Sequence, residues 1–272
     1  MGFKISGFCG THGEAKGEMD AVERIRKARA PRKSLVQVQF PGKGMALAYY
    51  NDQFDLQEGD RVYVDGKMEG LLGRVVEINY NFKIKRSEYK KVLAVVDTDI
   101  SGQFQIFGSH FVTFDPSVMP VEQVKLWFNP PEKEDEEFVV GSDDSSFMLE
   151  DLSGMNVSPA IGERGQNYYM ENRVVYLCLD GNRGFAIVEG TENYTVEFQY
   201  ENGAISQLVC DCPCAYTCKH EVAVMLQLRE TLTLLEEAGF QAWEDSRYMA
   251  AITKGSFFYF VINGKETGTF TI

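Results

Sequence analysis

The chain has 272 residues, of which 44% are hydrophobic and 25% are charged. Such a composition supplies a packed core and is typical of one large or two ordinary globular domains. The formal net charge of −13 repels phosphate backbones, so contact with nucleic acid would require a local basic patch. We find no apolar run long enough to span a membrane and no signal-peptide pattern, and we expect a cytoplasmic protein.

The first segment, residues 1–33, is polar and ends in a basic tract. Between 24 and 33 it carries six Lys or Arg residues and no acid, and a short helix is expected to end before Pro31. Both a basic arm and a solvated helix face fit this pattern. The candidates for nucleic-acid contact in this tract are Arg24, Arg26, Lys27 and Arg29.

Residues 34–128 are predicted to form a small β-barrel-like domain. Short β-branched and aromatic runs such as LVQVQF, MALAYY, DRVYVD and KVLAVVDT are separated by Gly, Asn, Asp and Pro, which favours a small barrel or sandwich. GQFQIFGSHFVTF is expected to add a hairpin, and VEQVKLWF at 121–128 fits either a strand or a helical turn.

Within this domain, YNFKIKRSEYKK has five basic residues between 83 and 91, interleaved with aromatic ones. Lys and Arg neutralise backbone phosphates, and aromatic faces stack on unpaired bases. The stretch therefore fits a nucleic-acid-binding strip, although a solvated hairpin has the same pattern. The candidate contacts are Lys83, Lys85, Arg86, Lys90 and Lys91.

Residues 129–165 are predicted to be an acidic linker, because nine acids stand against one lysine between 132 and 151. Residues 166–272 are predicted to form the second domain. The runs RVVYLCL, RGFAIVEG, YTVEFQY and AISQLVC indicate strands, and a helix is expected at about 219–238. The end, SFFYFVINGKETGTFTI, is expected to form two strands around a turn. The fold class is thus α+β and mostly β.

Four of the six cysteines lie within LVCDCPCAYTCKHEVAVML, residues 208–226. Cys210 and Cys212 are two apart at a strand end and so share a face, and Cys218 and His220 stand where the helix begins. Three thiolates and one imidazole give a closed tetrahedral shell, which favours one structural Zn²⁺. Structural zinc contributes about 10–16 kcal/mol of binding free energy in small peptides at neutral pH. We therefore expect the domain to need its metal to fold.

This pattern resembles the SWIM zinc finger, in which Cys-x-Cys and Cys-x-His pairs precede an apolar helix. The matching residues are CDCP at 210–213 and CKHEVAVML at 218–226. The five-residue spacing between Cys212 and Cys218 is short for that family. Cys214 lies inside the spacer, and is either a ligand in place of Cys212 or a spare thiol; Pro213 after Cys212 matches the family pattern and favours Cys212.

Two weaker signals are also present. FCGTHG places Cys9 and His12 at metal-ligand spacing, which fits half of a second metal site or unremarkable terminal residues. GDRVYVDGKMEGLLGRVVEI, residues 59–78, is similar to SH3-like and KOW-type barrels and to the DNA-end-binding barrel of primosomal helicases. That second resemblance implies a nucleic-acid-binding barrel.

The sequence contains no Gly-rich phosphate loop, nucleophile elbow or HExxH motif, so we expect a protein that is not an enzyme. The SWIM resemblance implies binding of DNA or protein in nucleic-acid metabolism. Two hypotheses follow: a DNA-binding protein that acts through the basic tracts, or an adaptor that docks onto a larger ATPase or nuclease.

Overall fold

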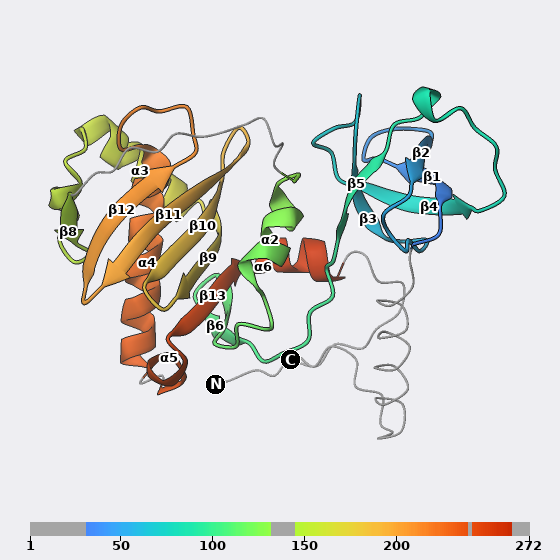
Figure 1. Cartoon of the computed structure of the whole chain (residues 1–272). Coiled ribbons are helices and arrows are strands. Elements are labelled where there is room, and N and C mark those ends of the chain that lie inside the picture. Colours follow the sequence, from blue (N-terminus) through green and yellow to red (C-terminus); the bar gives the residue numbers. More distant parts are fainter. Residues whose placement is uncertain (1–30, 132–144, 239–240, 263–272) are drawn as a thin grey trace, which may run out of the picture. The chain divides into compact units, whose positions relative to one another are not determined.

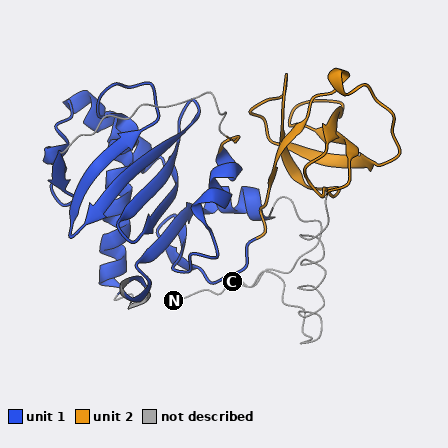
Figure 2. Cartoon of the chain, in the orientation of Figure 1, with its two compact units in different colours: residues 1–7, 100–128, 134–272 blue, residues 8–99, 129–133 orange. Residues whose placement is uncertain are grey.

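The computed structural model describes residues 31–131, 145–238 and 241–262. The candidate contacts between 24 and 29, together with Cys9 and His12, lie outside the described residues. The chain divides into two compact units (Figure 2). Of the described residues, the small unit comprises 31–99 and 129–131, and the large unit comprises 100–128, 145–238 and 241–262.

The small unit contains a five-stranded antiparallel sheet in the order β2-β1-β4-β3-β5 (Figure 1). In β1 every second residue is buried, and Val36 and Val38 pack with Val62, Val64 and Val75, as alternation in a half-buried strand requires. The elements are β1 (Ser34–Gln39), β2 (Leu47–Asn51), β3 (Arg61–Val64), β4 (Gly73–Asn79), the 3₁₀ turn η1 (Arg86–Glu88) and β5 (Val92–Val96).

The sheet of the small unit is not a closed barrel, in contrast to the sequence prediction. Its edge strands approach at one isolated parallel bridge, Tyr50 with Lys91, where the Tyr50 N–H donates to the Lys90 carbonyl at 2.8 Å. The strand β2 ends there because the Asn51 side chain bonds both the N–H and the C=O of Phe54 and turns the chain away. A continuous closing ladder therefore does not form among the described residues.

The large unit contains an eight-stranded antiparallel sheet in the order β6-β7-β13-β9-β10-β11-β12-β8. Its strands are β6 (Gln105–Phe107), β7 (His110–Thr113), β8 (Ser146–Met148), β9 (Val174–Asp180), β10 (Arg183–Glu189), β11 (Asn193–Glu201), β12 (Ala204–Cys210) and β13 (Tyr248–Thr253). The helical elements are α2 (Val121–Phe128), η2 (Leu152–Met155), α3 (Pro159–Met170), α4 (Lys219–Glu237), α5 (Gln241–Ser246), α6 (Lys254–Phe257) and the π-helical turn η3 (Phe258–Ile262).

Helix α4 packs along β9 to β12 and α3 packs on α4 (Figure 1). The apolar stripe of this helix is buried at all four of its positions: Val224, Leu228, Leu232 and Leu235. They join β9, β10 and β13 residues in one apolar cluster of twenty buried side chains. Hydrophobic burial between α4 and the sheet therefore stabilises the large unit.

Several segments differ from the sequence prediction. Residues 100–128, which were grouped with the barrel-like domain, contribute β6, β7 and α2 to the large unit, because β7 pairs with β13. Part of the predicted linker, 145–165, contains β8, η2 and the start of α3. The first of the two expected C-terminal strands is helical instead, as α6 and η3, because Phe257 and Phe260 are buried three residues apart.

Candidate metal centre

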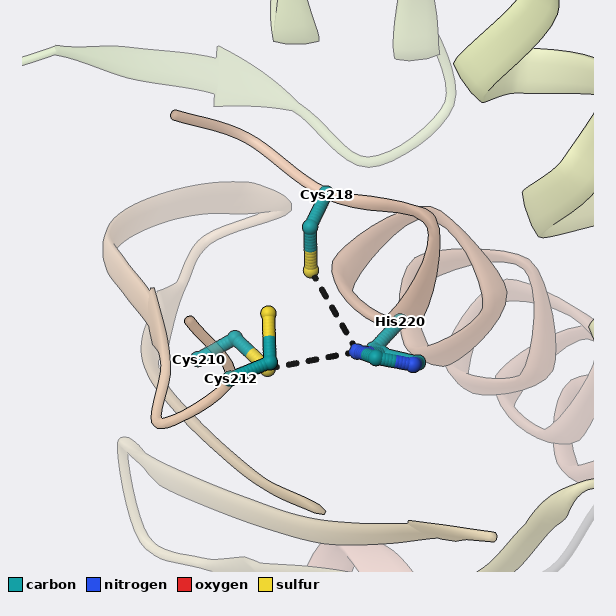
Figure 3. A group of neighbouring side chains, drawn as sticks. All are labelled: Cys210, Cys212, Cys218 and His220. Atoms are coloured by element: carbon teal, nitrogen blue, oxygen red, sulfur yellow. Dashed lines mark hydrogen bonds between the residues drawn. The ribbon is translucent and has the colours of Figure 1, made fainter. Parts of the chain in front are cut away.

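The four predicted ligands come together at the point where β12 ends and α4 begins (Figure 3). Cys210 is the last residue of β12, Cys218 is the N-cap residue of α4, and His220 is the second residue of that helix. The three sulfur atoms and one ring nitrogen all lie within 4.8 Å of one another. The four residues are therefore positioned to hold one metal ion.

The spacing of the ligand atoms can be compared with that of a tetrahedral shell. Bond lengths of about 2.3 Å to sulfur and 2.0–2.1 Å to nitrogen place neighbouring S and N ligands about 3.6 Å apart. The Nδ1 atom of His220 lies 3.6 Å from Cys210 Sγ and 3.7 Å from Cys218 Sγ. These two distances match, and they identify Nδ1 as the nitrogen that faces the thiols.

The turn that carries Cys210 and Cys212 is attached to the neighbouring strand β11. The Asp211 N–H donates to the Thr195 carbonyl at 3.1 Å, and the Asp211 carboxylate accepts the Thr195 N–H at 2.9 Å. This reciprocal pair fixes the backbone between the two cysteines. The pair thereby places both cysteines beside the start of the helix.

The other two ligands are fixed by the first turn of α4. The buried Glu221 carboxylate accepts the Cys218 N–H at 2.6 Å, which forms the second half of a capping box. Burial, together with the nearby Cys218 sulfur, raises the pKa of Glu221 to about 8. The backbone of both Cys218 and His220 is thus defined by the cap of the helix.

Two tyrosines enclose the imidazole of His220. The Tyr194 ring stacks on it, with centroids 4.4 Å apart and planes 21° apart, and the Tyr168 ring lies 5.4 Å away. Lys219 donates to the Tyr168 hydroxyl at 2.7 Å and so ties α3 to the start of α4. The Nε2 atom is buried and has no hydrogen-bond partner among the described residues. Only Nδ1 therefore faces a set of donor atoms.

The three thiols influence one another strongly because they are so close. The hydrogen bond from Cys210 lowers the pKa of Cys218 to about 4, while that same contact and burial raise the pKa of Cys210. Burial also raises the pKa of Cys212 to about 12. One thiolate is thus favoured at the helix N-terminus, and a cation would be needed to ionise all three.

The remaining cysteines of the described residues are not part of this cluster. Cys214 is exposed in the spacer, and the group of four forms without it. Cys178 is buried in β9, and burial raises the pKa of its thiol to about 11, so it is an inert core thiol. The geometry thus favours Cys212 over Cys214 as the ligand.

The predicted basic strip follows β4 on the small unit. Most of its charges are paired with acids, as four ion pairs show: Lys85 with Glu88 at 3.6 Å, Arg86 with Asp52 at 3.8 Å, Lys90 with Asp65 at 3.4 Å and Lys91 with Asp52 at 3.5 Å. No ion pair of Lys83 is found among the described residues. The strip is therefore less positive than its sequence suggests.

The sequence did not identify the residues that support the ligands. Asp211 and Glu221 were within reach of pattern analysis, because Asp211 lies between two ligands and Glu221 has the spacing of a capping box. Tyr168 and Tyr194 carried no such signal, because they reach His220 from α3 and β11 through the tertiary fold.

Comparisons with known proteins do not assign a family or a function to the chain. No protein-family description and no solved structure matches the chain. The chain is 37% identical over 71 residues to "Uncharacterized protein MJ1493" of Methanocaldococcus jannaschii. The match covers 26% of this chain and 30% of that protein, so the chain spans less than a third of its relative. Among the described residues, no helix is long and apolar enough to cross a membrane.

Proposed function

We propose that the chain is a zinc-binding protein whose ion has a structural role in a SWIM-type Cys₃His site. The proposal rests on the four donor atoms that lie within 4.8 Å of one another, and on the two distances from His220 Nδ1 to sulfur, which fit a tetrahedral zinc shell. Sulfur ligands select zinc over magnesium or calcium. Four protein ligands leave no coordination position for water, which is typical of a structural ion and not of a catalytic one. We therefore propose that the protein binds another macromolecule and does not catalyse a reaction at the zinc ion.

The test is the metal content and the coordination of the full chain. We expect about one zinc per chain by elemental analysis, and X-ray absorption with three sulfur ligands and one nitrogen ligand. Replacement by Co²⁺ should give the visible spectrum of a tetrahedral thiolate site. An open position occupied by water would contradict the structural role, and protein purified without metal that rejects both ions would contradict the site.

For the ligand of the protein, we propose DNA bound by the small unit. Between 31 and 99 eleven Lys or Arg residues balance ten acids, whereas between 100 and 272 ten stand against 26. The acidic large unit repels phosphate, so we expect the basic strip of the small unit to contact the DNA backbone. The pairs of Lys85 with Glu88 and of Lys90 with Asp65 are exposed, and such pairs contribute at most about 1 kcal/mol each, so phosphates can displace these carboxylates. Asp52, the partner of Arg86 and Lys91, is half-buried. Next to the strip, Arg32 lies 4.1 Å over the exposed ring of Tyr80.

Fluorescence anisotropy of labelled single- and double-stranded DNA across a salt series tests this proposal. Replacing Lys85 and Arg86 by alanine should weaken binding and reduce the log–log salt slope by about one per lost phosphate contact. Replacing Lys43 and Lys67 by alanine makes the same change in net charge outside the strip and should have little effect. Equal effects of the two double variants would exclude the strip as the DNA site.

The second candidate function is an adaptor that docks on a larger ATPase or nuclease, as the SWIM resemblance implies. The observation that favours it is the excess of acids in the large unit, which suits a basic protein surface. If the protein does not bind DNA even at low salt, the result would support the adaptor function. Both functions are consistent with a reducing cytoplasm, which we propose as the location because the thiols must stay available for the metal.

A further inference from the structure

A cavity of about 690 Å³ lies in the large unit, outside the apolar cluster beneath α4. Its lining includes Val175 of β9, Phe128 at the end of α2 and Phe260 of η3. These two rings contact each other with centroids 4.9 Å apart. The volume falls in the range of small-molecule sites, which are typically apolar with a few polar groups at fixed places.

The polar groups of the cavity are divided between its two ends. Lys254 and Ser109 stand where β13 ends and β7 begins, and Glu189 and Asn193 stand where β10 ends and β11 begins. In the sheet, β13 and β10 are separated by β9 alone. Two strand spacings of about 4.8 Å place the backbones of Lys254 and Glu189 about 10 Å apart.

At each end of the cavity, a polar side chain has donors or acceptors that its own hydrogen bonds do not use. The Lys254 ammonium donates to the Gly108 carbonyl at 2.9 Å, which uses one of its three donors. The Asn193 side-chain N–H donates to the Phe128 carbonyl at 2.8 Å, which leaves its side-chain oxygen as an acceptor beside Glu189. No ion pair of Lys254 or Glu189 is found in the part of the chain that the structure describes.

We propose that this cavity binds a zwitterionic ligand about 10 Å long with an apolar middle, in its simplest form a tripeptide with free termini. An extended peptide rises about 3.3–3.6 Å per residue, so three residues span the distance between the ends of β13 and β10. The ammonium group lies at Glu189 and Asn193, the carboxylate at Lys254, and the middle side chain against Val175 and the two phenylalanines. This site is independent of the metal centre.

Isothermal titration of the full, metal-loaded chain with the tripeptide Ala-Leu-Ala tests the proposal. We expect saturable binding at millimolar concentration or below, with methyl NMR shifts at Val175. Acetylation of the peptide N-terminus should weaken binding about tenfold, as loss of a charged hydrogen bond does. The same acetylation should have no further effect on Glu189→Gln, and amidation of the C-terminus should have none on Lys254→Gln.

The matched controls are Glu197→Gln and Arg183→Gln, which remove the same charges outside the cavity and should bind like the unchanged protein. Both cavity variants keep a polar side chain of similar size, and equal thermal unfolding midpoints will show that they are folded. The proposal is overturned if the doubly blocked peptide binds as well as the free one, or if no binding occurs at about 10 mM. Binding without shifts at Val175 would overturn it as well.

Discussion

Replacing Cys218 by serine separates the contribution of the metal from that of the helix cap. Cys218 is both the N-cap residue of α4 and a member of the ligand cluster. Serine is among the best N-cap residues, so the substitution keeps or improves the start of the helix. A hydroxyl is a poor zinc ligand beside a thiolate, so the same change removes one of four bonds to the ion. The metal-free variant should therefore be as stable as the metal-free protein.

The size of the effect follows from linkage between folding and zinc binding. At free zinc about a thousandfold above its dissociation constant, binding to the folded state alone adds roughly 4 kcal/mol to the free energy of unfolding. For a unit of this size each kcal/mol shifts the unfolding midpoint by about 2–4 °C, so zinc should raise it by roughly 8–16 °C. Cys218→Ser should lose nearly all of that increase.

Differential scanning calorimetry measures the unfolding midpoint of the unchanged protein and of Cys218→Ser. A scan with chelator gives the metal-free midpoint, and a scan with zinc gives the increase caused by the metal. Cys214→Ser is the matched control, because it makes the same chemical change at an exposed thiol outside the cluster. It should keep its zinc and the full increase of the midpoint. The reasoning is refuted if Cys218→Ser retains zinc with an unchanged midpoint, or if it is destabilised equally with and without the metal.

Two further substitutions test the packing around the site and the titration of a buried histidine. A Cβ at Gly165 of α3 would lie 2.5 Å from the Val222 Cβ, so Gly165→Ala should cost about 1–3 kcal/mol in urea unfolding; Gly162→Ala, on the same helix with only a 4.0 Å contact, should be neutral or slightly stabilising. Burial lowers the pKa of His110 below 6.5, so the unfolded chain binds more protons than the folded one and the free energy of unfolding should fall as the pH drops below 6.5. His110→Gln should reduce this pH dependence, and an unchanged slope would contradict it.

The ligand set could be predicted because it is local in sequence. Eleven residues contain all four ligands, and the periods of a strand and of a helix orient them toward one point. The strands β1 to β5 were predicted for the same reason, since each has its own alternation or β-branched run. Local sequence patterns therefore predict whether a segment is a strand or a helix and which of its side chains share a face.

Pairing between distant segments was not contained in those patterns. The strand β13 inserts between β7 and β9, and so joins residues 110–113 to residues 174–180. Nothing in the run YMAAIT specifies these neighbours, and the hairpin β6–β7 carries no sign that its partner lies more than a hundred residues ahead. The two units therefore meet at about residue 99 and not at residue 128, where the sequence patterns place the boundary.

The position of the centre indicates what the ion stabilises. In the segment 211–217, which joins β12 to α4, Cys212 alone is buried, so hydrophobic contacts do not hold this loop in place. The helix that follows is different, because eleven of its residues are buried against the sheet and α3. Burial on that scale argues against the expectation that the whole domain needs metal to fold. Removing zinc should instead open the loop and the first turn of α4, which hydrogen exchange would detect as lost protection near Cys218 while amides around Leu228 stay protected.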